Sequence, residues 1–383
     1  MLRGLKWFGF LLLIINPILF LTGTDYIYRA AIYQQPGIDD LKLFPYRVVS
    51  ASSSPQPWPI SASYNTTEMP VEMASALTDF KSVAFLAIQD GQIIHELYWG
   101  GYGPEVNSNS FSAGKSIVAA LIGRALMLGH INSIDQPVAD FLPSFNTVER
   151  AAITVRHVLQ MSSGLNFQES YSKPISDTTE AYYGDDLVGL IERLSPESPP
   201  GVSWKYRSGD TQILAMVLEQ ATGQTVSSFA ATELWQPLGA TSDAQWSLDR
   251  RGGIEKAYCC FYSNPRDFAR VAQLYLRHGR AGDQQLLPFE FVEQSVVPHG
   301  LPDAKTGLRS DYYGLHWWRL NHQDTEVFYM RGILGQYVWV IPSRDLIVVR
   351  LGHQRSPVKR AGHPQDVYTY IEGILEMFPV QGQ

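Results

Sequence analysis

The sequence has few of the residues that would build a cross-linked, metal-binding or nucleic-acid-binding protein. Its two cysteines, Cys259 and Cys260, are adjacent and cannot close a long loop, so we expect small buried free thiols and no disulfide framework. The net charge is −7 and no block of basic residues is present, which argues against a nucleic-acid partner. No His-Glu-x-x-His motif or similar cluster occurs, so we expect neither a metal ion nor another cofactor.

Long hydrophobic runs are scarce too, apart from one at the N-terminus. Arg3 and Lys6 precede an apolar run over residues 7–21, which is short for a membrane span and resembles the core of a signal peptide. No small-x-small cleavage site follows it. We therefore expect residues 1–31 to form an uncleaved signal-anchor that attaches the exported protein to the membrane, on its periplasmic or extracytoplasmic face. A cleaved signal peptide is the alternative.

The remainder has an ordinary globular composition, with 45% hydrophobic and 17% charged residues. Residues 32–72 are rich in Pro, Ser and Gln, so we expect a linker or a surface arm with little regular structure. Residues 73–383 are expected to form the folded domain.

Hydrophobic periodicity predicts the order of the elements in that domain. Two β-prone runs, 83–88 and 93–99, flank Asp90-Gly91, which is a strong hairpin signal. Helices are expected at 112–128, 153–161, 210–222, 265–278 and 364–377, and later strands at 313–320, 336–341 and 346–351. Strands at both ends with helices between them predict an α/β fold of the α+β type. Its antiparallel sheet is flanked by helices and carries an inserted helical subdomain.

One serine–lysine pair stands out chemically. Ser112 and Lys115 are one of three Ser-x-x-Lys spacings, and the other two, which start at Ser170 and Ser356, lie in polar or proline-containing stretches. Only Ser112 begins an apolar helix, which should be buried. Residues three apart share a helix face, so the hydroxyl and the amine can meet.

The position of Lys115 suits a general base. Both the helix dipole and burial disfavour a charged amine at the start of a buried helix, and a neutral amine can deprotonate a serine. The backbone N–H of Ser112 can donate to a developing oxyanion. The alternative is that Ser112 only caps the helix while Lys115 reaches solvent.

Five segments occur in the order in which one enzyme family carries its motifs. They are residues 111–116, 153–165 with its final Ser-Gly-Leu, 200–208 with 221–223, 313–318 and 335–342. Over residues 75–378 the chain resembles the family of class C β-lactamases, DD-peptidases and related esterases, and within it the 6-aminohexanoate-dimer hydrolases. The resemblance implies a β-lactamase- and transpeptidase-like fold, with the active site between the sheet and the helical subdomain.

The resemblance also implies roles for individual residues. Ser112 would be the nucleophile, Lys115 its base, and Tyr206 a proton relay to the leaving group. The backbone N–H of Ile333 would complete the oxyanion hole with that of Ser112. Further residues would contact the substrate, namely Tyr171, Ser208, Arg331 and Gly332. A protonated Lys115 would favour the ionised form of Tyr206.

Two departures from the family pattern bear on the substrate. Ser208 stands where Asn is frequent, and Met330 stands where Lys or His is usual. Lys305-Thr306-Gly307 spells the family's third motif, but it precedes the 313–320 strand instead of following it. Arg331 is the candidate substitute for the missing cation.

We therefore expect a serine hydrolase that cleaves an ester or amide bond of a small molecule through an acyl-enzyme on Ser112. One alternative is a catalytically silent sensor or binding domain that resembles a penicillin-binding protein. The other is a cell-wall peptidase or β-lactamase.

Overall fold

The computed structural model describes residues 24–379. The predicted signal-anchor lies mostly outside this range, and its described end includes the start of helix α2 (Tyr26–Tyr33). Within residues 24–379, every helix is too short or too polar to cross a bilayer.

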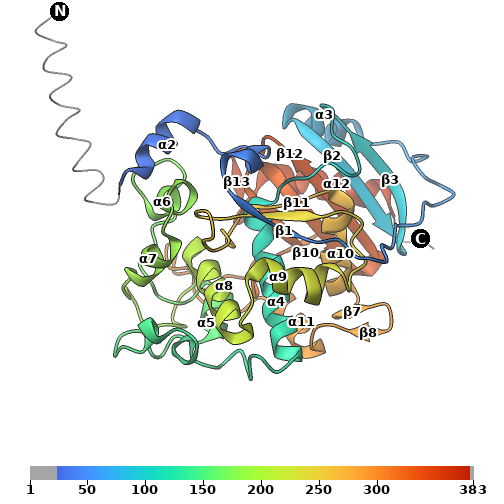
Figure 1. The fold of residues 1–383 in the computed structure, drawn as a ribbon. Helices are drawn as coiled ribbons and strands as arrows, with labels where there is room; N and C mark the ends of the chain where they lie inside the picture. Colours follow the sequence, from blue (N-terminus) through green and yellow to red (C-terminus); the bar gives the residue numbers. More distant parts are fainter. Residues whose placement is uncertain (1–23, 380–383) are drawn as a thin grey trace, which may run out of the picture.

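A six-stranded antiparallel sheet forms the centre of the molecule (Figure 1). In spatial order its strands are β3 (Gln92–Tyr98), β2 (Ser82–Gln89), β12 (Leu346–Gly352), β11 (Gln336–Ile341), β10 (Thr325–Gly332) and β9 (Trp318–His322). Strand β2 pairs with β12, so the two ends of the domain meet in one sheet. This confirms the predicted architecture.

Helices cover both faces of this sheet. Val338 and Val340 of β11 pack in one core with residues of α4 (Gly114–Met127) and α10 (Pro265–Leu276). Trp339, between them, packs in a second core with α3 (Val71–Asp79) and α12 (Gln365–Met377). Alternate side chains of a strand point to opposite faces, and every residue of β11 is buried for this reason.

The inserted segment between β3 and β9 is mainly helical. Its other helices are α5 (Val155–Leu159), α6 (Asp177–Tyr183), α7 (Leu187–Glu192), α8 (Ser208–Thr222), α9 (Val226–Ala230) and α11 (Phe289–Val296). Short helical turns are η1 (Asp40–Leu43), η2 (Phe111–Ala113), η3 (Val138–Asp140), η4 (Pro143–Phe145), η5 (Ala231–Trp235), η6 (Ile333–Gly335) and η7 (Pro342–Arg344).

Three smaller sheets complete the described part of the chain. One has the order β1 (Tyr46–Val49), β5 (Ala244–Ser247), β6 (Phe261–Ser263) and β4 (Ser108–Asn109). The others are the pairs β7 (Arg280–Ala281) with β8 (Gln284–Gln285) and β13 (Lys359–Arg360) with β14 (His363–Pro364).

The predicted hairpin is confirmed, whereas one predicted strand is wrong. Asp90 and Gly91 have φ values of 50° and 73°, the left-handed conformation that a type I′ turn requires. The expected strand at 313–320 is extended only from Trp318 onward. His316 has a φ of 60°, and a Cβ on Gly314 would lie 2.1 Å from the Ser295 carbonyl oxygen. This tight, irregular backbone cannot form a regular ladder.

The segment 32–72 packs against the domain. Strand β1 pairs with β5, and Ile38 and Val49 are fully buried. Arg47 forms an ion pair of 2.9 Å with Glu255, whose side chain is fully buried. The segment is therefore an arm packed on the domain, as one of the two expectations had it, and its regular structure between α2 and α3 is limited to η1, β1 and the isolated bridge at Ile60.

Candidate active site

Ser112 lies in the turn η2, directly before the buried helix α4. The Ser110 N–H donates to the Phe261 carbonyl oxygen at 2.8 Å, which joins this turn to strand β6. Phe111 has a φ of 44°, unusual for a bulky residue, and its N–H donates to Asn109 Oδ1 at 2.9 Å. The surrounding contacts thus hold a strained turn next to Ser112, a feature that gathers at functional sites.

The end of strand β10 lies against this turn because Gly332 has no side chain. A Cβ at Gly332 would lie 2.2 Å from the Ser110 carbonyl oxygen. Ile333 follows at once and lines the same cavities as Ser112. The close approach therefore brings the backbone of Ile333 next to the turn that carries Ser112, and its role as the second oxyanion donor stays a prediction.

The side chain of Lys115 is directed at Ser112. Lys115 Nζ donates to Ser112 Oγ at 3.2 Å, to Ser208 Oγ at 3.1 Å and to the Tyr258 carbonyl oxygen at 2.6 Å. These three acceptors are uncharged, and the residue is 1% exposed. Burial lowers the pKa of Lys115 to about 8, although the negative charge of Glu169 acts in the opposite direction. A substantial fraction of the amine is then neutral near pH 8 and can accept a proton.

The phenol of Tyr206 lies on the same side of the site. Lys115 Nζ is 5.3 Å from the Tyr206 ring centre, and Tyr206 lines the second cavity together with Ser112. Burial, and then the negative charge of Glu169, raise the pKa of Tyr206 above its usual range. Lys115 is not among the causes of this shift, and the phenol of Tyr206 is neutral at neutral pH.

Glu169 is a site residue that the sequence analysis missed. Its carboxylate accepts hydrogen bonds from the Ser208 N–H at 2.7 Å and from Ser208 Oγ at 2.9 Å. It also accepts one from the hydroxyl of Tyr171. Its main hydrogen-bond partner, Ser208, is 39 positions away in the sequence, so no local pattern points to this pair. The only sequence signal for Glu169 was its position two residues before the candidate residue Tyr171.

Ser208 therefore connects two charged groups instead of simply facing a substrate. Its Oγ accepts from Lys115 and donates to Glu169. It also starts helix α8 and is 2% exposed. Its role as a substrate contact remains a prediction, and its position beside the amine is the observation.

Two cavities meet at Ser112. The first has a volume of about 720 Å³ and the second of about 830 Å³. Both are lined by Ser112, Tyr171, Ile333 and Arg355. Volumes of this size are typical of sites for small organic ligands.

Arg331 and Lys305, but not Met330, line the second cavity. The Arg331 guanidinium lies 3.1 Å from the Trp318 ring centre and donates to the Gly362 carbonyl oxygen at 3.1 Å. Met330 is fully buried in the core. Arg331 is thus the cation at the expected position of the motif. The Lys305-Thr306-Gly307 loop, which precedes strand β9, contributes a lysine to the same cavity.

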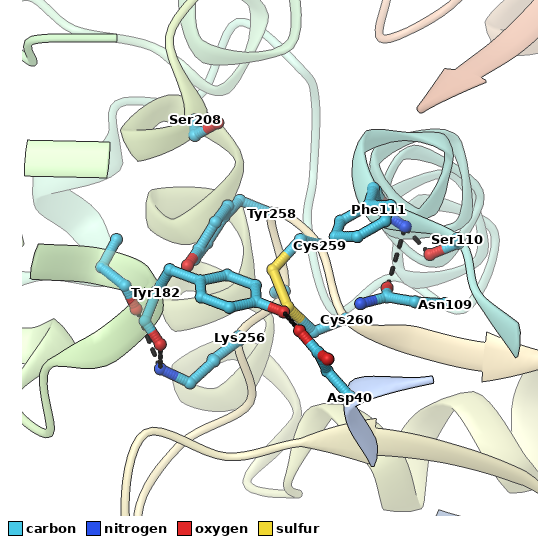
Figure 2. Close-up of a disulfide and its surroundings, with 12 residues drawn as sticks. Asp40, Asn109, Ser110, Phe111, Tyr182, Ser208, Lys256, Tyr258, Cys259 and Cys260 are labelled. Atoms are coloured by element: carbon cyan, nitrogen blue, oxygen red, sulfur yellow. Dashed lines mark hydrogen bonds between the residues drawn. A yellow bond between two sulfur atoms is a disulfide. The ribbon is translucent and has the colours of Figure 1, made fainter. Parts of the chain in front are cut away.

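Cys259 and Cys260 form a disulfide, so the expectation of free thiols is wrong (Figure 2). A tight turn brings the two sulfurs together, and Cys260 has a left-handed φ of 65°. Figure 2 shows the disulfide between Tyr258 and Phe111, and all three of Phe111, Tyr258 and Cys259 line the first cavity. The turn that carries the disulfide therefore also carries the carbonyl oxygen that binds Lys115.

Metal ligands do not gather in residues 24–379, where no three His, Cys, Asp or Glu side chains form a cluster. The chemistry that the site can perform is carried by a hydroxyl, an amine of lowered pKa and a neutral phenol.

Comparison with known proteins places these features in a family. A family model described as "Beta-lactamase" matches residues 72–367. The 6-aminohexanoate-dimer hydrolase of Paenarthrobacter ureafaciens is 27% identical over 314 residues, which cover 78% of this chain and 79% of that protein.

Solved structures show the same fold. A structure described as "Putative 6-aminohexanoate-dimer hydrolase from Bacillus anthracis" has a TM-score of 0.75 and 18% identity, and covers 88% of this chain and 92% of its own. A family VIII carboxylesterase has a TM-score of 0.64 and 16% identity, and covers 84% and 99%.

Proposed function

The chain belongs to the Beta-lactamase family of serine hydrolases, and on this basis we propose that it cleaves an ester or amide bond of a small molecule through an acyl-enzyme on Ser112. The observation that carries this proposal is the 3.2 Å contact between Lys115 Nζ and Ser112 Oγ. The lowered pKa of Lys115 supports it, since an amine that can lose its proton near neutral pH can act as a base.

In the proposed acylation, neutral Lys115 takes the proton of Ser112 as Oγ attacks the substrate carbonyl carbon. The N–H groups of Ser112 and Ile333 stabilise the resulting oxyanion. The tetrahedral intermediate then collapses, and the bond to the leaving group breaks. Tyr206 gives its proton to the leaving oxygen or nitrogen and recovers one from Lys115, which returns to its neutral form.

Deacylation repeats these steps with water as the nucleophile. Lys115 accepts a proton from the water as it attacks the acyl carbon, and it gives that proton to the Ser112 oxygen when the acid leaves, which restores the neutral amine. Because the water takes the place that the leaving group has vacated, the same three side chains serve both half-reactions.

The test is hydrolysis by wild-type protein and by Ser112→Ala, with short-chain p-nitrophenyl esters, small amides and nitrocefin as substrates. We expect ester or amide turnover by the wild type, a fluorophosphonate adduct on Ser112, and loss of both in the variant. Ser356→Ala is the matched control, because Ser356 starts another Ser-x-x-Lys spacing but lines neither cavity. Folded wild type without turnover or adduct would instead support a silent binding domain, and nitrocefin as the preferred substrate would support a β-lactamase.

We further propose that the protein is exported and attached to the membrane by the N-terminal part of the predicted 1–31 segment, because residues 26–31 belong to α2 and pack on the domain. The basic residues before the apolar run at 7–21 support this, and so does the disulfide, since such bonds persist in oxidising compartments. Fractionation of cells should recover the full-length chain with membranes after a carbonate wash. Recovery of a shortened soluble form would support a cleaved signal peptide.

A further inference from the structure

We propose that the first cavity is an acyl chamber that accepts the apolar acyl chain of the substrate, and that helix α2 forms its outer wall. The acyl chamber is the 720 Å³ cavity that extends from Ser112 to Ile27 and Ala30 of α2. This inference rests on the proposed function and narrows its substrate class to esters or amides of medium- to long-chain carboxylic acids.

The chemistry of the lining distinguishes the two cavities. Two of the 26 residues that line the acyl chamber are charged, Lys173 and Arg355. In the second cavity, eight of 20 lining residues are charged. Apolar side chains such as Ile27, Phe111 and Leu334 surround much of the acyl chamber. An apolar group is therefore stabilised in the first cavity and a polar one in the second.

Tyr206 decides which half of the substrate enters which cavity. This proton donor lines the second cavity and does not line the acyl chamber. The leaving group must lie beside its proton donor, which places it in the polar second cavity. The acyl half projects from the opposite side of the carbonyl carbon at Ser112 and therefore enters the acyl chamber.

The wall formed by α2 is fixed to the helical subdomain. Arg29 Nη1 donates to the Tyr183 carbonyl oxygen at 3.1 Å, and the Tyr183 hydroxyl donates to the Gln34 carbonyl oxygen at 3.3 Å. The rings of Tyr33 and Tyr183 stack with centres 6.5 Å apart. Figure 1 shows α2 lying against α6, at the side of the molecule where the chain enters the fold. These contacts make α2 a fixed boundary of the chamber.

The facing wall is equally defined. Cys259 lines the chamber, and the disulfide holds it in a turn whose Tyr258 carbonyl oxygen binds Lys115. Lys256 in the same segment donates to the Ala181 and Tyr182 carbonyl oxygens at 2.9 Å and 2.8 Å, at the end of α6. The chamber is thus bounded by elements that are bonded to one another and is larger than an acetyl group needs.

The experiment measures kcat/KM for p-nitrophenyl esters from acetate to dodecanoate, each below its micelle-forming concentration. We expect kcat/KM to rise by up to about fourfold for each methylene that the chamber buries, and then to level off. Ala30→Trp and, separately, Ala31→Trp should fill the chamber and lower decanoate hydrolysis about tenfold, with acetate hydrolysis nearly unchanged. Ala31 is exposed on the chamber wall, so its replacement tests the idea even where Ala30→Trp fails to fold.

Ile32→Trp is the matched control, because Ile32 is on the same helix, is 72% exposed and does not line the chamber. The inference is overturned if kcat/KM is flat or falls with chain length, or if Ala31→Trp and Ile32→Trp affect all esters equally. The proposed function fails on a different result, namely ester hydrolysis by Ser112→Ala at the wild-type rate.

Discussion

At the scale of single residues, the site depends on one buried amine whose direct hydrogen-bond partners are uncharged. Lys115 is almost fully buried, and hydroxyl and carbonyl oxygens accept its three hydrogen bonds. Removal of an ammonium group from water favours its neutral form, which is the form that catalysis requires. The electrostatic opposition between burial and Glu169 sets the balance of the two forms.

The pH dependence of activity follows from this balance. Because the pKa of Lys115 is lowered to about 8, the neutral amine increases as the pH rises through that value, and kcat/KM should rise with it. Lys115→Arg stays charged at every pH and should lose activity by about 10²–10⁴-fold. The control is Lys42→Arg, at an exposed lysine, which should keep the wild-type activity and pH profile. An equal loss of activity in Lys42→Arg and Lys115→Arg would contradict the assignment of Lys115 as the base.

Glu169 should affect the position of that pH limb. Its negative charge raises the pKa of Lys115, so Glu169→Gln should move the acid limb of kcat/KM to lower pH. The Ser208 N–H keeps an oxygen acceptor in this variant, which separates the charge from the hydrogen bond. A limb that stays in place or moves to higher pH would show that Glu169 acts on the site in another way.

At the scale of elements, the decisive contact joins the end of β10 to the turn before α4. Gly332 permits this contact, since a Cβ there would nearly overlap the Ser110 carbonyl oxygen at 2.2 Å. The two elements are more than 200 positions apart in the chain. The absence of a side chain at Gly332 therefore brings together Ser112 and Ile333, the proposed nucleophile and the proposed second oxyanion donor.

Gly332→Ala should separate these elements. We expect kcat/KM to fall about a hundredfold, as a displacement near 1 Å can do, and the free energy of unfolding to fall by about 1–3 kcal/mol. Gly103→Ala is the control, because a Cβ there meets nothing within 4 Å. Denaturant unfolding and ester hydrolysis measure the two effects, and wild-type activity in Gly332→Ala would refute this account of the site.

The elements also show where sequence reasoning succeeds and where it stops. The β2–β3 hairpin and strands β11 and β12 were predicted because their signals are local, namely a turn dipeptide and mainly apolar runs. The predicted 313–320 strand failed because the close approach of Gly314 to Ser295 is a tertiary constraint. Ser112, Lys115 and Tyr206 could be found through helix periodicity and family resemblance, whereas the pairing of Glu169 with Ser208 could not.

At the scale of the whole molecule, the N-terminal arm is part of the folded domain. Arg47 on strand β1 pairs with Glu255, whose carboxylate also accepts the Ser227 N–H at 3.1 Å. A buried carboxylate without its cation is strongly destabilising. The arm thus contributes to the stability of the domain, although the sequence analysis placed the start of the domain after the arm.

Arg47→Met should lower the free energy of unfolding by about 3 kcal/mol, because it leaves Glu255 buried and unpaired. Activity per folded molecule should stay close to wild type, since neither residue lines the two cavities. Arg277→Met is the control: its ion pair with Asp345 is solvent-exposed, so its loss should change stability by less than about 1 kcal/mol. Equal losses in the two variants would refute the special role of the arm.

The Cys259–Cys260 disulfide has a practical consequence for anyone who prepares this protein. The base is held by a carbonyl oxygen on the same turn as the paired sulfurs, so material made in a reducing cytosol or stored with dithiothreitol differs chemically from oxidised material at the catalytic centre. Oxidised and reduced preparations of the same sequence are therefore expected to differ in turnover. A thiol titration performed alongside each assay would identify which form had been studied.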